Sequence, residues 1–217
     1  MDEFVVWGVP GSPYVRAALL GLEEKKMRWR LAPLGMGENK SPAHLARHPF
    51  GRMPVVQHGD FRLYEAQAIL RYLDKVGSGP RLTPDDPKAE ARMNQLMGIA
   101  DWYFLPQVSS AIVFQRVVAP RFGLPVDEEK IAAALPGARL CIAEVARLLG
   151  DQAFMAGDSL SLADLMLAPQ VAFLADCAEG REMLDAHPDL AAWNRRMGER
   201  PSLQATTWER VAEKAAA

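Results

Sequence analysis

The chain has 217 residues, of which 49% are apolar and 24% charged, a composition typical of a folded globular protein. Its 27 acidic and 25 basic side chains leave a formal net charge of −2, so composition gives no reason to expect nucleic acid or an anionic membrane as the main partner. The acidic start argues against a secretory signal, no window resembles a membrane span, and Cys141 and Cys177 are too far apart for a metal or redox motif. We therefore expect a cytoplasmic protein with no metal site.

Short apolar runs alternate with a helical pattern at the start of the chain. The sequence predicts a strand at residues 4–7, a helix at 15–24 and a second strand at 29–31. On the helix, Ala18, Leu19 and Leu22 share one face. This order is typical of a β-α-β unit and indicates a parallel pair of strands.

Residues 52–73 predict a strand, a tight turn, a second strand and a helix. Pro54 opens the first strand, residues 58–60 have turn chemistry, and apolar residues recur at helical spacing from 66 to 73. Glu65 lies in the first turn of the helix, where the macrodipole favours a negative group. Backbone N–H groups at a helix start can hold a carboxylate, while Glu65 can hold an ammonium group nearby. The segment can therefore bind an amino acid by its two charged ends.

Dense Gly, Pro and Asp residues between 77 and 87 mark a linker. Beyond it, helical patterns follow at 88–118, 128–149, 162–175, 190–198 and 203–214. We predict a first domain at 1–78, a linker at 79–87 and an all-helical domain at 88–217. Within the second domain, Ser161 and Asp164 have the spacing of a capping box, which explains both residues structurally.

These segments together resemble the cytosolic glutathione S-transferase superfamily, and in particular its serine-type, bacterial and plant-like members related to the phi, theta and beta classes. Residues 47–54, Arg-His-Pro-Phe-Gly-Arg-Met-Pro, match the approach to the family's cis-proline, and residues 161–164 match a motif of its helical domain. The resemblance covers essentially the whole chain. It implies an α/β thioredoxin-like N-terminal domain of order βαβαββα, an all-α C-terminal helical domain and a cis bond between Met53 and Pro54.

Ser12 is the candidate catalytic residue. From the residues alone, Ser12 as N-cap and Pro13 as first helical residue form an ordinary helix start. The same position can stabilise a thiolate, because a hydroxyl at a helix N-terminus lies in positive potential. The resemblance favours this role, since serine-type relatives use a serine at this turn. Tyr14 and Tyr64 are the competing hydroxyls. A serine in place of the cysteine of thiol-exchanging relatives disfavours disulfide chemistry.

The resemblance also implies the remaining contacts to glutathione. In relatives, the residue before the cis-proline offers backbone groups to the cysteinyl part, and polar residues near 39–40 contact the glycyl carboxylate. Three positions depart from the usual pattern and alter the expected affinity: Ala66 replaces a serine, Gln67 an arginine and Arg52 a glutamine. The predicted glutathione-binding residues are Asn39, Lys40, Arg52, Met53, Pro54, Glu65, Ala66 and Asp101.

A second substrate is expected to face the first long helix. The candidates for this electrophile site are Tyr14, Trp102 and Tyr103. Met97, Phe104 and Phe114 are further candidates, although apolar residues at helical spacing more often belong to a core. Phe50 is either a core residue or an anchor into a partner subunit, as in some family dimers.

The resulting hypothesis is a homodimeric glutathione S-transferase that joins the glutathione thiolate to small hydrophobic electrophiles. Glutathione is then a co-substrate, and no cofactor is bound covalently. Two alternatives remain on the same residues. One is a specialised glutathione-dependent isomerase, dehalogenase or peroxidase; the other is a non-catalytic binding or interaction module.

Overall fold

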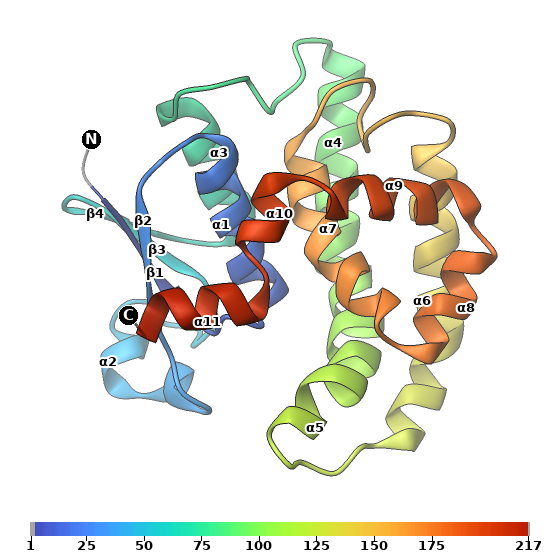
Figure 1. Cartoon of the computed structure of the whole chain (residues 1–217), viewed down its shortest axis with the longest axis horizontal. Coiled ribbons are helices and arrows are strands. Elements are labelled where there is room, and N and C mark those ends of the chain that lie inside the picture. Colours follow the sequence, from blue (N-terminus) through green and yellow to red (C-terminus); the bar gives the residue numbers. More distant parts are fainter. Residues whose placement is uncertain (1–2, 217) are drawn as a thin grey trace. The chain divides into compact units, whose positions relative to one another are not determined.

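The computed structural model describes residues 3–216, which form two compact units (Figure 1). The first unit combines the chain up to Thr83 with the segment that starts at Glu199, and the second runs from Pro84 to Gly198. The segment from 199 onward therefore packs with the N-terminal part of the chain. The predicted boundaries at 1–78, 79–87 and 88–217 stay a prediction. Within residues 3–216, no helix has both the length and the apolar character needed to cross a membrane.

A four-stranded mixed sheet forms the centre of the first unit, in the order β2-β1-β3-β4. Its strands are β1 (Phe4–Gly8), β2 (Trp29–Pro33), β3 (Val55–His58) and β4 (Phe61–Tyr64). The predicted parallel pair is confirmed as β1 and β2, while β3 runs antiparallel to both β1 and β4. The predicted hairpin at 58–60 connects β3 to β4. The sheet thus has the strand order and directions of a thioredoxin-like domain.

Two helices, α1 (Pro13–Glu24) and α3 (Ala66–Val76), pack together beside the sheet. Their apolar faces and the inward side chains of the strands make one buried core. The core includes residues predicted to share a helix face, namely Ala18, Leu19 and Leu22 on α1 and Ile69 and Leu73 on α3. The link between β2 and β3 carries the short helices η1 (Glu38–Lys40) and α2 (Pro42–Leu45).

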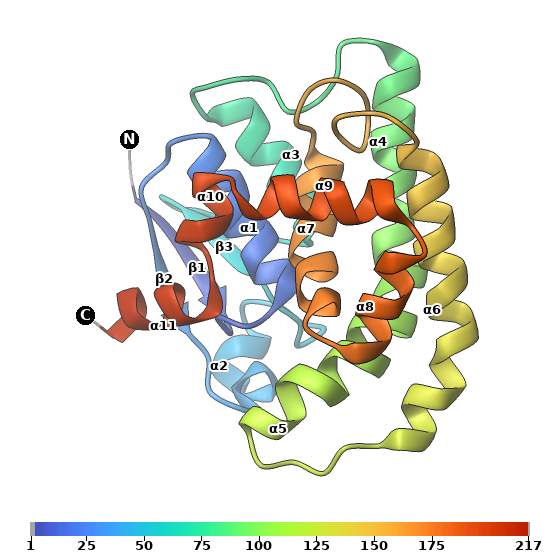
Figure 2. The same ribbon diagram turned by 45° about the vertical axis from the view of Figure 1, so that its right-hand side comes forward.

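The C-terminal segment differs from the prediction of one helix at 203–214. It forms two helices, α10 (Pro201–Ala205) and α11 (Trp208–Ala216), separated at Thr206 and Thr207. The Thr206 hydroxyl donates to the Ser202 carbonyl at 2.8 Å, and the Thr207 hydroxyl accepts from the Arg210 amide at 3.3 Å. Side-chain bonds to nearby backbone of this kind compete with a continuous helix. Helix α11 then packs on β2, as Figures 1 and 2 both show.

The second unit is helical throughout its regular elements. They are α4 (Pro87–Ile99), the wider π-type helix η2 (Ala100–Val118), α5 (Ala119–Arg121), α6 (Glu128–Leu149), α7 (Leu162–Ala175), α8 (Ala178–Asp185) and α9 (Pro188–Gly198). The predicted bounds of α6 and α7 match, whereas α8 was missed. Nearly every side chain of α7 is buried, which makes it the central helix of this unit.

The predicted capping box at the start of α7 is confirmed. Asp164 accepts hydrogen bonds from the Ser161 amide at 2.9 Å and the Ser161 hydroxyl at 2.7 Å. The two cysteines are buried thiols, as their apolar contexts predict. Burial raises the pKa of both, that of Cys177 to about 12, so neither thiol has a reactive environment.

Candidate functional site

Ser12 lies at the start of α1 and acts as its N-cap. Its backbone is extended, with φ −78° and ψ 124°, and its Oγ accepts a hydrogen bond from the Val15 amide at 3.4 Å. Pro13 is the first helical residue, as predicted, and the first turn of α1 carries no acidic side chain that would offset the positive end of the helix dipole. A hydroxyl has one donor and two acceptor sites. Capping occupies an acceptor site, so the half-buried Ser12 can still donate its proton.

The turn that carries Ser12 contacts the segment before β3. The Ser12 amide donates to the Val9 carbonyl at 3.0 Å, which closes the turn. The Val9 amide in turn approaches the Met53 sulfur at 3.4 Å. The Met53–Pro54 peptide bond is cis, the isomer that the resemblance implies. The structure therefore brings Ser12 and Met53, two of the predicted site residues, to neighbouring segments.

The register of the sheet adds Glu65 to the same region. Trp7 near the end of β1 pairs with Val55 at the start of β3, and Val55 pairs with Tyr64 at the end of β4. The residues that follow β1, precede β3 and follow β4 thus lie at one end of the sheet. Those are the Ser12 turn, the Met53–Pro54 bond and Glu65 at the start of α3.

Glu65 has an uncommon backbone conformation. Its φ is 72° and its ψ is 112°, in the region that L-residues rarely adopt, and it is the N-cap of α3, one place before the first helical turn. The side chain makes no capping bond to its own helix and is exposed. Strained non-glycine residues are enriched at binding sites. Sequence reasoning missed this conformation, because nothing in the residue types around Glu65 signals a positive φ.

Side chains from the segment between β2 and β3 contact the backbone carbonyls of residues 50–52, just before Met53. Asn39 donates to the Gly51 carbonyl at 2.8 Å, and the Lys40 ammonium lies 3.4 Å from the Phe50 carbonyl. The buried ring of His44 bonds through Nε2 to the Arg52 carbonyl at 2.7 Å. Asn39 and Lys40 were predicted as contacts to glutathione, and that role stays a prediction. His44 was not predicted to have a role here.

An aromatic cluster of His48, Phe50 and Tyr64 lies beside residues 50–52. The buried His48 ring stacks on Tyr64 with ring centroids 4.4 Å apart, and both contact Phe50 edge-on. Burial, together with the nearby His44, Arg52 and Lys40, lowers the pKa of His48. Phe50 is 68% exposed, so the prediction of a core role for it is wrong. Its alternative role as an anchor into a partner subunit stays a prediction.

The candidates for the electrophile site fall on different elements. Tyr14 is half-buried on α1, whereas Trp102 and Tyr103 are 78% and 61% exposed on η2, next to Asp101. Met97 and Phe104 are fully buried within the second unit and belong to its core. The roles of Tyr14, Asp101, Trp102 and Tyr103 stay predictions.

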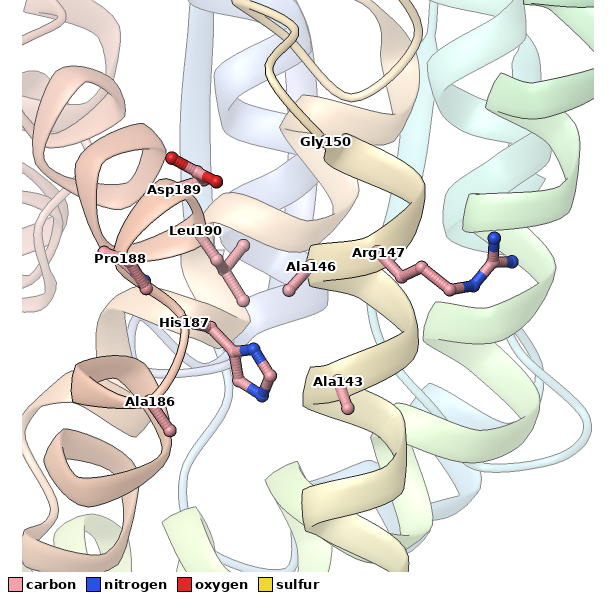
Figure 3. Close-up of a pocket in the computed structure, with 9 residues that line it drawn as sticks. All are labelled: Ala143, Ala146, Arg147, Gly150, Ala186, His187, Pro188, Asp189 and Leu190. Atoms are coloured by element: carbon pink, nitrogen blue, oxygen red, sulfur yellow. The ribbon is translucent and has the colours of Figure 1, made fainter.

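One hollow in the second unit has a volume of about 340 Å³ and lies between the end of α6 and residues 186–190 (Figure 3). None of the predicted site residues lines it. The His187 ring points toward Ala143, while the Arg147 side chain extends away from the hollow and pairs with Glu144 at 2.7 Å. The hollow is lined mostly by small apolar residues, and it lacks the thiol-activating and glutathione-binding groups predicted for the candidate site.

The mixed sheet, the cis-proline at the start of β3 and the two helix N-termini at one end of the sheet define a thioredoxin-like protein with an appended helical unit. The comparisons with known proteins identify the family. Residues 3–75 match the model of the glutathione S-transferase N-terminal domain, and residues 128–196 match that of the C-terminal domain.

Relatives of known sequence or structure agree. A probable glutathione S-transferase from Oryza sativa subsp. japonica is 32% identical over 94% of this chain and 95% of its own length. The crystal structure of glutathione transferase F7 from Populus trichocarpa superposes with a TM-score of 0.83 at 28% identity, covering 98% of this chain and 99% of that one. Maize glutathione S-transferase I, solved with an atrazine glutathione conjugate, gives a TM-score of 0.81 at 27% identity and 99% coverage of both chains. The chain belongs to the glutathione S-transferase family.

Proposed function

We propose that this transferase joins the glutathione thiolate to small hydrophobic electrophiles, and that Ser12 stabilises the thiolate. One observation carries the proposal: the Ser12 hydroxyl caps α1 with an acceptor site, and its turn lies beside Met53 at the end of the sheet that also presents Glu65. Maize glutathione S-transferase I was solved with an atrazine glutathione conjugate, which supports an apolar carbon electrophile as the second substrate.

The energetics of thiol activation match this geometry. A free thiol has a pKa of about 8.5, so only a few per cent is ionised near neutral pH. Lowering that pKa by roughly two units takes about 2.7 kcal/mol of preferential stabilisation of the thiolate. One hydrogen bond to a charged group contributes about 1.5–3 kcal/mol, and the N-terminus of α1 adds its dipole. The thiolate sulfur then attacks the electrophilic carbon, and a carbon–sulfur bond forms as the displaced group leaves with its electron pair.

The same end of the sheet offers partners for the rest of glutathione. Glu65 would hold the α-ammonium group of the γ-glutamyl end, and the amide of Ala66 at the start of α3 would hold its carboxylate. The backbone of Met53, beside the cis bond to Pro54, would pair with the cysteinyl part. Asn39 and Lys40 would contact the glycyl carboxylate, and Arg52 would contact a carboxylate group of glutathione.

The thiol pKa of bound glutathione tests the proposal directly. A titration followed by ultraviolet thiolate absorbance should give a pKa well below the free value for the native protein, and a value near the free one for Ser12→Ala. Turnover of Ser12→Ala near neutral pH should fall by roughly 25-fold, the change in thiolate fraction for a two-unit shift, while its affinity for glutathione stays within a few fold. Ser12→Thr keeps a capping hydroxyl and should retain most of the shift. A wild-type pKa in Ser12→Ala would overturn the proposal.

Glu65→Gln should weaken glutathione binding by on the order of tenfold, because it removes a charge-assisted hydrogen bond but keeps the side-chain shape. Calorimetric titration with glutathione measures the effect. A glutathione analogue without the γ-glutamyl amino group is the matched control, since it should bind Glu65→Gln and the native protein equally. Equal loss of affinity for both ligands would mean that Glu65 does not contact the ammonium group.

We further infer a homodimer that acts in the cytoplasm. Phe50 supports the dimer, because a 68% exposed aromatic ring beside His48 and Tyr64 is suited to insertion into a partner subunit. Light scattering after gel filtration should give twice the chain mass for the native protein and a smaller, concentration-dependent mass for Phe50→Ala. An unchanged mass in that variant would remove Phe50 from the interface.

A further inference from the structure

Gly11 contacts a side chain from the far end of the chain. A Cβ atom added at Gly11 would overlap the six-membered ring of Trp208, the first residue of α11. The backbone of Gly11 does not adopt a left-handed conformation. Turn geometry therefore does not require glycine here. The close approach of the indole ring requires it, and that ring covers the residue next to Ser12.

Residues 200–206, which precede Trp208, are hydrogen-bonded to both ends of α1. At one end, Glu24 accepts from Arg200 at 2.9 and 3.0 Å and from the Ser202 hydroxyl at 2.6 Å. At the other end, the buried Arg16 donates to the Leu203 carbonyl at 2.9 Å and lies 3.5 Å from the Thr206 hydroxyl. Arg16 stands one helical turn after Ser12, so the same stretch of α1 anchors both the Ser12 turn and the approach to α11.

The residues that follow Trp208 on α11 pack against the sheet. Val211 is part of the buried core, and the Lys214 ammonium lies 3.7 Å from the centroid of the Trp29 ring on β2. Trp208, Val211 and Lys214 are spaced by three residues, which places them on one face of α11. The indole ring of Trp208 is thus held in place by contacts of the residues before it and of the residues after it.

We propose that Trp208 is a positioning residue for catalysis: its ring holds the backbone of Gly11 and thereby fixes where the Ser12 hydroxyl lies. This inference rests on the proposed role of Ser12. A hydrogen bond to a thiolate depends steeply on distance and angle. Another contact of the turn runs through Val9 and Met53, on the side of the cis-proline segment. Losing the indole removes the contact at Gly11, and the Ser12 hydroxyl then spends less time in the productive geometry.

The test compares two variants that disturb the contact from opposite sides. Trp208→Ala removes the ring, and Gly11→Ala adds a methyl group that the ring cannot accommodate in place. Each should lower kcat by on the order of tenfold with KM for glutathione within about threefold, because misplacement of a catalytic group affects the chemical step. Each should also raise the thiol pKa of bound glutathione toward the free value. Trp208→Phe keeps a flat ring and should restore most of kcat.

Glu213→Ala, an exposed change on the same helix, is the control and should behave like the native protein. A folded Trp208→Ala, or a folded Gly11→Ala if the first variant does not fold, with native kcat and native thiol pKa would overturn the inference. Ser12→Ala is titrated alongside. If it raises the thiol pKa while the Trp208 and Gly11 variants do not, only the positioning role falls. If Ser12→Ala itself leaves the pKa unchanged, the proposed function fails and this inference with it.

Discussion

Asp164→Ala is expected to lower the free energy of unfolding of the helical unit by about 3–5 kcal/mol. The carboxylate of Asp164 is fully buried and accepts four hydrogen bonds. Two come from Ser161, and the others come from the Met155 amide and the Trp193 indole, each at 2.9 Å. Each buried donor left without an acceptor costs about 1–3 kcal/mol, and the loss of the helix cap alone costs about 1 kcal/mol. Chemical denaturation followed by near-ultraviolet circular dichroism measures the change.

Asp158→Ala is the matched control for this prediction. Asp158 is an exposed acid in the loop that leads to α7, so its removal should change the free energy of unfolding by less than about 0.5 kcal/mol. Burial raises the pKa of Asp164, and the hydrogen bonds that its carboxylate accepts oppose that rise. A loss of under about 1 kcal/mol in Asp164→Ala would show that water replaces the carboxylate without much cost.

The hydrogen bonds of Asp164 show which contacts a sequence pattern can predict and which it cannot. The bond between Ser161 and Asp164 spans three residues, so its spacing is visible in the sequence and the capping box was predicted. The bond from Trp193 joins residues 29 positions apart, and no local pattern indicates it. The same contrast holds at the candidate site. Ser12 as N-cap and the strand pairing around Pro54 follow from local signals, whereas the packing of Trp208 on Gly11 joins the two ends of the chain.

Other misses have equally specific causes. Helix propensity and amphipathic spacing continue through residues 203–214, but two adjacent threonines bond to nearby backbone and divide the helix. The positive φ of Glu65 is set by the segments around it and not by its own residue type. The bond from His44 to the Arg52 carbonyl depends on a loop whose course no periodicity predicts.

A second buried group, the ion pair between Lys25 and Asp74, was also invisible in the sequence. The two side chains are each 2% exposed, and Lys25 Nζ lies 3.2 Å from Asp74 Oδ1. Lys25 also donates to the Pro80 carbonyl at 2.9 Å, while Asp74 accepts from the amides of Leu82 and Thr83 and from the Thr83 hydroxyl. The pair therefore ties the ends of α1 and α3 to the segment that leaves the first unit.

Asp74→Ala should lower the free energy of unfolding of the first unit by about 3–5 kcal/mol, since it leaves a buried ammonium without its counter-charge. In a Lys25→Met background the same substitution should cost clearly less, because no charge is then left unpaired. A double-mutant cycle by chemical denaturation measures this coupling, which should be at least about 1 kcal/mol. Additive losses would mean that the hydrogen bonds to the 80–83 segment, and not the ion pair, carry the effect.

In the native protein, acid should remove the stabilisation that the ionised Asp74 carboxylate contributes to the free energy of unfolding. Burial opposes ionisation of Asp74, but hydrogen bonds from Leu82, Thr83 and Lys25 outweigh it and lower the pKa of the carboxyl below its ordinary value. A carboxyl whose pKa is lower in the folded than in the unfolded chain stabilises the fold fully above its unfolded pKa of about 3.9. That contribution is lost as pH falls through the lower, folded pKa. The stability difference between the native protein and Asp74→Asn should therefore stay constant from pH 7 to about 5 and shrink below about pH 4. A difference that stays constant into stronger acid would contradict a lowered pKa for Asp74.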